Sequence, residues 1–192
     1  LLLDYELTTD FEQFAASELP KFVYADRSVS ADLFFHSHGL LNERGTRSIE
    51  LAPFDFEELK VFFPVYDKKS ALPFDVFAAI FYLVSRYEEY QPFVKDIHGR
   101  FTAHLSVSSK LGILDKPVVN IWAIRIKEII QERFPMLQFP EKRYKFIPTY
   151  DIDSAYAYSH KGLVRILGGY FLALKAFDWK EVASRTKVIF GN

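Results

Sequence analysis

The first part of the chain has the pattern of short strands separated by turns. Up to residue 72, apolar runs rich in β-branched and aromatic residues are interrupted by groups such as Asp26-Arg27-Ser28 and Asn42-Glu43-Arg44-Gly45. This alternation is typical of strands joined by turns. We therefore predict strands at residues 21–26, 33–41, 48–51 and 59–63.

Two local features of this part allow a helix. Thr9 and Glu12 have the spacing of a capping box, which predicts a short helix that Pro20 ends. Residues 55–63 have two interpretations. Their apolar run indicates a strand, but the acidic residues before it could cap a helical turn.

From Pro73 onward the apolar residues follow the period of a helix. They recur at intervals of three and four residues at Phe77, Ile80, Phe81, Val84 and Tyr87. Asp75 can cap the first turn, so we predict a long buried helix over residues 75–90. The same spacing predicts a second long helix over residues 118–134, ended by a proline. Weak alternation between the two helices predicts a short strand at residues 101–105.

A charged link at residues 141–145 marks the expected domain boundary. Residues 146–153, Phe-Ile-Pro-Thr-Tyr-Asp-Ile-Asp, then indicate a strand over residues 145–151 that runs into a polar end. We expect an N-terminal domain over residues 1–143 and the beginning of a second domain over residues 144–192.

The tail of the chain has the pattern of two amphipathic helices. The first begins after Gly162, and the second follows the capping-box pair Asp178 and Glu181. Together with the preceding elements, this predicts an α/β or α+β fold with a mixed sheet and two long helices in its first domain.

The composition is that of a globular protein. Of the 192 residues, 49% are hydrophobic and 26% are charged, which is enough apolar surface to bury a core and excludes a disordered chain. Lys and Arg total 24 and Asp and Glu total 25, so the net charge of −1 gives no overall attraction to nucleic acid. The absence of cysteine excludes disulfides, thiolate metal ligands and cysteine nucleophiles.

The sequence predicts a soluble protein, with a cytoplasmic location favoured. Its longest apolar runs fall short of the ~20 residues that span a bilayer, and no signal-peptide pattern opens the chain. Residue 1 is Leu and the sole methionine is Met136, so we expect the natural protein to begin earlier. Gly168-Gly169 lies in a helical pattern rather than in a phosphate-binding loop, which argues against nucleotide binding.

Asp151 and Asp153 are the sharpest chemical feature of the sequence. In an extended strand their side chains point to the same side as Thr149, so two carboxylates share one face. Such a pair can hold a divalent cation, or one carboxylate can ligate the metal while the other accepts a proton. Alternatively, the two acids cap the next helix. The pattern alone leaves both interpretations open.

Two other groups are less suited to chemistry. His36 and His38 place two imidazoles on one face of a predicted strand, but without a third ligand a surface or hydrogen-bonded pair is a better interpretation than a metal site. The run Ser85-Arg86-Tyr87-Glu88-Glu89-Tyr90 could bind a sugar or orient a partner domain. A ladder of Arg and Glu at a helix end is the favoured alternative.

Several blocks of the sequence resemble those of a known class of bacterial protein. They are Ala71-Leu72-Pro73-Phe74-Asp75-Val76-Phe77-Ala78-Ala79, Ser85-Arg86-Tyr87-Glu88-Glu89-Tyr90, His98-Gly99-Arg100-Phe101 and Pro148-Thr149-Tyr150-Asp151-Ile152-Asp153-Ser154-Ala155-Tyr156. Together they resemble bacterial proteins in which an uncharacterised N-terminal domain precedes a polysaccharide deacetylase domain of the NodB-homology family of carbohydrate esterases. The likeness covers nearly the whole chain.

The resemblance implies a hydrolase that removes N- or O-acetyl groups from a glycan with the help of a divalent metal, zinc or similar. In that family the first motif, at the end of the first barrel strand, supplies a base and a metal ligand. Carried over to this sequence, Asp151 looks like the catalytic base and Asp153 like the metal ligand. The implied partners are the glycan substrate and the protein's own C-terminal deacetylase domain, a distorted (β/α) barrel that needs roughly another 200 residues. The 192 residues alone are expected to be inactive and to bind no metal.

The sequence departs from the family's pattern in two respects. The two aspartates of the motif are usually adjacent, whereas Ile152 separates them here. The family's His-x-x-x-His ligand pair and its later acid-supplying histidine have no counterpart within these residues. The alternative is therefore a non-catalytic module, in which residues 1–143 bind a glycan or position another domain.

Overall fold

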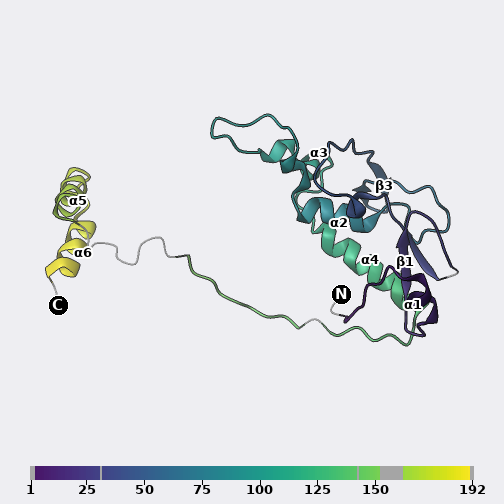
Figure 1. Cartoon of the computed structure of the whole chain (residues 1–192). Helices are drawn as coiled ribbons and strands as arrows, with labels where there is room; N and C mark the ends of the chain where they lie inside the picture. The colour runs from purple at the N-terminus through teal and green to yellow at the C-terminus, as the bar shows by residue number, and fades with distance from the viewer. Residues whose placement is uncertain (1–2, 31, 142, 152–161, 191–192) are drawn as a thin grey trace. The chain divides into compact units, whose positions relative to one another are not determined.

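The structure, a computed structural model, describes residues 3–30, 32–141, 143–151 and 162–190 (Figure 1). The chain divides into two units, Leu1–Glu141 and Lys142–Asn192. The described residues form helices and two small sheets, so the expected α+β class is confirmed. Among them, no helix has the length and apolar character needed to cross a membrane.

The first sheet is a parallel pair. It consists of β1 (Phe22–Ala25) and β2 (Leu33–His36). The far edge of β2 is partly covered, because the backbone N–H of Ala71 donates to the carbonyl of Phe34 at 2.8 Å. Both strands were predicted, but the second is shorter than expected and is followed by a 3-10 turn, η1 (Leu40–Asn42).

The second sheet is an antiparallel hairpin. It consists of β3 (Phe54–Phe56) and β4 (Leu59–Val61), and Glu57 in the turn between them has a φ of 52°. For residues 55–63 the hairpin confirms the strand interpretation rather than the helical turn. The chain then passes directly from β4 into the buried core.

Two other predicted strands are wrong. Residues 48–51 form no strand, although Ile49 and Leu51 pack against the core. Residues 101–105 contain a 3-10 turn, η3 (Ala103–Leu105), instead of a strand. In both places the apolar pattern reflects side-chain burial, which coil and turns also allow. A strand in addition needs a neighbouring strand that pairs with its backbone groups.

The first unit contains four α-helices and a further 3-10 turn within its described residues. They are α1 (Phe11–Ala16), α2 (Val76–Val84), η2 (Tyr87–Tyr90), α3 (Val107–Lys110) and α4 (Val118–Arg133). The prediction of a helix over residues 118–134 is confirmed by α4. The cap of α1 is Asp10 rather than Thr9, because the Asp10 carboxylate accepts the N–H groups of Glu12 and Gln13.

The long helix predicted over residues 75–90 is interrupted. α2 ends at Val84, and Arg86 has a φ of 55° before η2 begins. A residue in the left-handed region cannot continue a right-handed helix. The apolar period continues across the interruption because Tyr87 in η2 is also buried.

Aromatic rings form the centre of the first unit. Phe62, Phe74 and Trp122 are buried, and the centroid of the Trp122 ring lies 6.1 Å from that of Phe62 and 5.6 Å from that of Phe74. The ring of Tyr82, in α2, lies 5.7 Å from Phe62. Edge-to-face contacts of this kind add to the stabilisation from burial. One core therefore joins α2, α4 and the segment after β4.

The described residues of the second unit form a pair of helices, as predicted. They are α5 (Leu163–Lys175) and α6 (Trp179–Phe190). The Asp178 carboxylate accepts the backbone N–H of Glu181 at 3.0 Å, which confirms the predicted cap.

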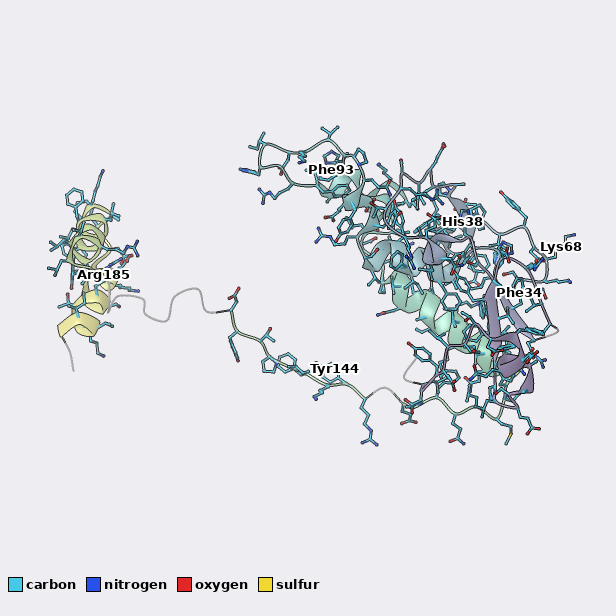
Figure 2. The ribbon with its side chains drawn as sticks, in the orientation of Figure 1. Phe34, His38, Lys68, Phe93, Tyr144 and Arg185 are labelled. Carbon is cyan, nitrogen blue, oxygen red and sulfur yellow. The ribbon has the colours of Figure 1, made fainter. Side chains whose placement is uncertain are left out.

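The strand predicted over residues 145–151 is wrong. Residues 143–151 follow an extended course without regular secondary structure, and their side chains are exposed; Figure 2 shows Tyr144 on this part of the trace. A strand requires a neighbouring backbone to complete its hydrogen-bonded ladder. No described strand pairs with this segment.

Candidate functional site

Asp75, at the start of α2, carries a carboxylate that is only 1% exposed. Its Oδ1 accepts the backbone N–H of Ala78 at 2.9 Å, which caps the helix. Its Oδ2 accepts the hydroxyl of Tyr24 at 2.8 Å and the backbone N–H of His38 at 2.6 Å. One carboxylate thus joins α2 to β1 and to the segment that follows β2.

The surroundings of Tyr24 raise the pKa of its phenol. Burial is the largest cause, and it is partly offset by a hydrogen bond with the side chain of Ser37. The negative charge of Asp75 raises the pKa further. The phenol therefore stays protonated at neutral pH and remains a hydrogen-bond donor.

The cluster of Tyr24, Ser37 and Asp75 is suited to holding the fold together. Both oxygens of the Asp75 carboxylate have donors, and Ser37 is buried as well. A reacting group needs a cavity that admits a substrate, whereas the Asp75 carboxylate is buried and both of its oxygens are bonded to the protein itself. The local sequence pattern indicates the helix cap but not the contacts with Tyr24 and His38, which lie 51 and 37 residues away along the chain.

A second polar cluster lies at the end of α2. The hydroxyl of Tyr87 accepts the backbone N–H of Arg47 at 2.9 Å, and Oε2 of Glu88 accepts the backbone N–H of Val107 at 2.7 Å. Burial raises the pKa of Glu88, although the bond from Val107 opposes this effect. Burial likewise raises the pKa of Tyr82 to about 12. Tyr87 and Glu88 thus attach two loops to η2.

The remaining polar residues of this run pair with each other. Arg86 and Glu89 form an ion pair with an N–O distance of 2.6 Å, so the Arg–Glu interpretation is confirmed for them. Tyr90 is exposed at the end of η2. The run thus has an inner pair, Tyr87 and Glu88, that supports the fold, and an outer set that faces solvent.

The two histidines singled out in the sequence contact different neighbours. Nδ1 of His36 lies 3.9 Å from an Asp67 carboxylate oxygen. The ring of His38 packs on Phe63 with a centroid distance of 5.1 Å. Within the described parts of the chain, no three acidic or imidazole side chains are grouped as metal ligands.

The two candidate residues of the deacetylase motif are Asp151 and Asp153. Asp151 is exposed at the end of the extended segment, whereas Asp153 lies outside the described residues. A carboxylate oxygen is a suitable ligand for a divalent cation. A catalytic zinc site typically has three protein ligands, and the structure places one candidate, Asp151, in this region.

Comparison with known proteins places the first unit in a family. A family model described as a family of unknown function (DUF7033) matches residues 1–135. The chain belongs to this family. No curated protein and no solved structure gives a significant match to the chain.

The DUF7033 match coincides with the packed core rather than with the motif. It reaches just beyond α4 and includes both polar clusters, those around Asp75 and Glu88. It ends before the charged link at residues 141–145 and before Asp151. The DUF7033 part and the aspartate pair are therefore separate features of the chain.

Proposed function

We propose that residues 144–192 open a metal-dependent polysaccharide deacetylase domain, and that the DUF7033 unit is the accessory domain that precedes it. The observation that carries the proposal is the block Thr149-Tyr150-Asp151-Ile152-Asp153, which resembles the first motif of the deacetylase family. The block follows an extended apolar run, as it would at the end of a strand.

Exposed apolar side chains in the second unit support this proposal. Phe146 and Ile147 are exposed in the extended segment, and one face of α5 is exposed as well. The exposed apolar residues of α5 are Leu163, Val164, Leu167, Phe171, Leu172 and Leu174. A strand and a helix within a barrel would bury such side chains against neighbouring elements.

The chemistry proposed for the pair follows from the two carboxylates. Asp151 would accept a proton from the water that attacks the acetyl carbonyl, because a carboxylate is a general base once it is ionised. Asp153 would help to hold a divalent cation. When bound, such a cation acts as a Lewis acid that polarises the carbonyl oxygen. Further ligands would have to come from other parts of the protein.

Acetate release by the complete natural protein tests the proposal. The substrate is an N-acetylglucosamine oligomer, and the variants are Asp151→Asn and Asp153→Ala. Removal of a general base typically lowers a rate by about 10²- to 10⁴-fold, and added metal cannot restore the proton acceptor. Loss of a metal ligand lowers the occupancy of the metal site. We therefore expect a rising metal concentration to restore part of the activity of Asp153→Ala but none of the activity of Asp151→Asn.

A matched control is Asp178→Asn, which changes a carboxylate of the same unit that caps α6. It should leave the metal dependence of acetate release unchanged. Rescue of Asp151→Asn rather than Asp153→Ala would exchange the two roles. Wild-type turnover in both variants would show that the pair takes no part in catalysis.

The alternative is that the DUF7033 unit is a non-catalytic module for glycan binding or domain positioning. The observation that favours it is the extent of the family match, which ends before the aspartate pair. This alternative is tested by calorimetry, which measures how the same oligomer binds to the Asp151→Asn variant with and without Tyr90→Ala. Affinity that is lost when Tyr90 is changed to Ala would place a glycan site on the DUF7033 unit.

A further inference from the structure

A loop of the first unit, residues 91–102, projects from the body of that unit and has exposed apolar side chains. Figure 1 shows it as the teal segment that precedes α3, and Figure 2 labels Phe93 within it. Val94 is 80% exposed and Ile97 is 95% exposed. Single exposed apolar residues are ordinary in proteins, so the construction of the loop and the charges around it decide what it can bind.

The 91–102 loop is fixed by its own hydrogen bonds. The Asp96 carboxylate accepts the backbone N–H groups of His98 and Arg100, both at 2.8 Å. The backbone N–H of Asp96 donates to the carbonyl of Arg100 at 3.0 Å, and the N–H of Gly99 donates to the carbonyl of Asp96 at 3.0 Å. Gly99 has a φ of 76°, a conformation that favours glycine in a tight turn. Ile97 is held within this turn.

The base of the loop is also anchored. The rings of Phe93 and Phe101, one on each side of the turn, lie 5.1 Å apart in an edge-to-face contact. Glu88, which precedes the loop, accepts the backbone N–H of Val107, which follows it. Because the loop is already ordered, it loses little conformational entropy when it binds a partner.

The most exposed charges of the 91–102 loop are basic. Lys95 is exposed, and the side chain of Arg100 is 68% exposed. The side chain of Asp96 is 26% exposed, and its carboxylate lies 3.6 Å from Nε of Arg100. At the base of the loop, the carboxylates of Glu88 and Glu89 are bonded to groups of the same unit. An anionic surface can therefore approach the aliphatic side chains next to two accessible cations.

The residue before the loop is an exposed tyrosine. Tyr90 ends η2 and is 70% exposed. Tyr is enriched where a membrane meets water, because its ring is apolar and its hydroxyl is polar. Lys and Arg side chains at such an interface place their apolar stems along the hydrocarbon and their charges among the headgroups. The aliphatic, basic and aromatic side chains of this loop are thus those that the surface of a bilayer favours.

A protein pocket suits the loop less well than a bilayer does. The residues that contribute most to binding in protein interfaces are enriched in Trp, Tyr and Arg, whereas Val is under-represented. The exposed aliphatic groups of this loop are Val94 and Ile97. Because they lie on a projecting loop, a protein partner would need a cavity shaped to receive them, whereas a bilayer needs no matching shape.

We propose that the 91–102 loop is a peripheral membrane anchor, which inserts Val94 and Ile97 into a bilayer that contains anionic lipids. Lys95 and Arg100 would then lie among the lipid headgroups, where each cation adds to the attraction. One loop of this size gives weak and reversible binding, since stable attachment to a membrane takes more than one such signal. The inference goes beyond the proposed deacetylase function and does not depend on it.

Fluorescence from single positions of the complete natural protein tests the insertion. An environment-sensitive fluorescent amino acid is placed at position 97, and vesicles of equal parts of phosphatidylglycerol and phosphatidylcholine are added. We expect the emission to shift to the blue and to be quenched by lipids that carry a quencher on the acyl chain. Because the signal comes from one position, binding through another surface of the protein does not produce it.

The matched control has the same fluorescent amino acid at position 66. Tyr66 is 88% exposed in a loop of the same unit that also has the exposed residues Lys68 and Lys69. Residues 64–70 include no exposed Val, Leu or Ile. Position 66 should therefore show neither the blue shift nor the quenching, since cations without aliphatic groups do not enter the bilayer.

Vesicle titrations of variants with the probe at position 97 separate the two contributions. Val94→Asp should raise the lipid concentration needed for half of the spectral change by at least about tenfold, since it places a charge among acyl chains. The double variant Lys95→Gln/Arg100→Gln should raise it by about tenfold, because it removes two cations from the anionic surface. Lys68→Gln/Lys69→Gln removes the same charge from the control loop and should change it by less than about twofold.

Four results would overturn the inference. They are the absence of a blue shift at position 97, equal shifts at positions 97 and 66, an equal response to vesicles of phosphatidylcholine alone, and a shift that grows with protein concentration when no vesicles are present. The last result would show that a second copy of the chain covers the loop. Circular dichroism of each variant checks that the fold is retained, so that a lost response reports on the loop itself.

Discussion

α4 and α5 both have the apolar pattern of an amphipathic helix, but their surroundings in the structure differ. α4 buries a stripe at Val118, Trp122, Ile126 and Ile130. α5 buries Ala173, while Leu163, Leu167 and Phe171 on another face are exposed. An apolar period therefore predicts that a helix forms, and it does not identify what covers the helix.

The same difference extends to the two units. The first unit has one continuous core that joins its helices and hairpin around Phe62 and Trp122. In the second unit, the described helices contact each other but leave much of their apolar surface exposed. The DUF7033 unit thus has the packing of a self-sufficient domain, and α5 and α6 have the packing of elements that need further partners.

Matched substitutions of phenylalanine give the largest expected contrast between the units. Phe62→Ala should lower the free energy of unfolding of the first unit by about 3–5 kcal/mol, because it leaves a cavity in a buried aromatic core. Phe171→Ala should change stability by less than about 0.5 kcal/mol, because that ring is 67% exposed. Urea denaturation followed by Trp fluorescence and circular dichroism measures both. Equal losses would contradict the difference in packing.

Substitution of the buried Asp75 carboxylate gives the next largest expected loss of stability. Asp75→Ala should destabilise the first unit by about 3 kcal/mol, because it removes the helix cap and leaves the Tyr24 hydroxyl and the His38 N–H without their acceptor. Tyr24→Phe, which removes one of these bonds, should cost only about 1 kcal/mol. Thermal and urea melts of the two variants provide the test. If Asp75→Ala lowered the free energy of unfolding no more than Tyr24→Phe does, this would contradict the conclusion that the carboxylate connects α2 to β1.

The smallest expected effect is the change in stability with pH that Glu88 causes. Burial raises the pKa of Glu88 above its ordinary value of 4.5, so the folded protein binds this proton more tightly than the unfolded chain. Its contribution to stability is therefore present at low pH and is lost as pH rises from about 4.5 through the raised pKa. Glu88→Gln keeps an acceptor for the Val107 N–H and cannot ionise.

Urea melts at a series of pH values measure the Glu88 effect. Relative to Glu88→Gln, the wild-type protein should lose stability as pH rises through this window. Glu89→Gln is the control, because Glu89 is the neighbouring residue whose partner is Arg86 on the exposed side. A wild-type protein that gained stability relative to Glu88→Gln over the same window would contradict the burial argument.

Local patterns predicted the helices better than the strands. The period of α4 and the caps Asp75 and Asp178 are encoded within a few residues, and the structure confirms each of them. The strand predicted at residues 48–51 failed because pairing depends on a distant partner that a local pattern does not record. The left-handed Arg86, which divides the predicted helix, likewise has no local signal such as Gly or Asn.

The candidate sites show the same limit. The position of Asp75 before an apolar helical period identifies it as a cap, but its bonds to Tyr24 and His38 form only when the chain folds. The aspartate pair was found from its motif, and the structure gives Asp151 an exposed position. The role proposed for Asp151 comes from the family resemblance of its motif rather than from its position in the structure.

Amide hydrogen exchange on the 192-residue chain tests the central difference between the units most directly. We expect the amides of α4 to exchange slowly, near the rate set by global unfolding of the first unit. The amides of α5 and α6 should exchange at least about 10³-fold faster, because little apolar burial opposes their local opening. Protection of α5 equal to that of α4 would contradict this difference between the units, since it would show that the second unit is already a fully packed domain.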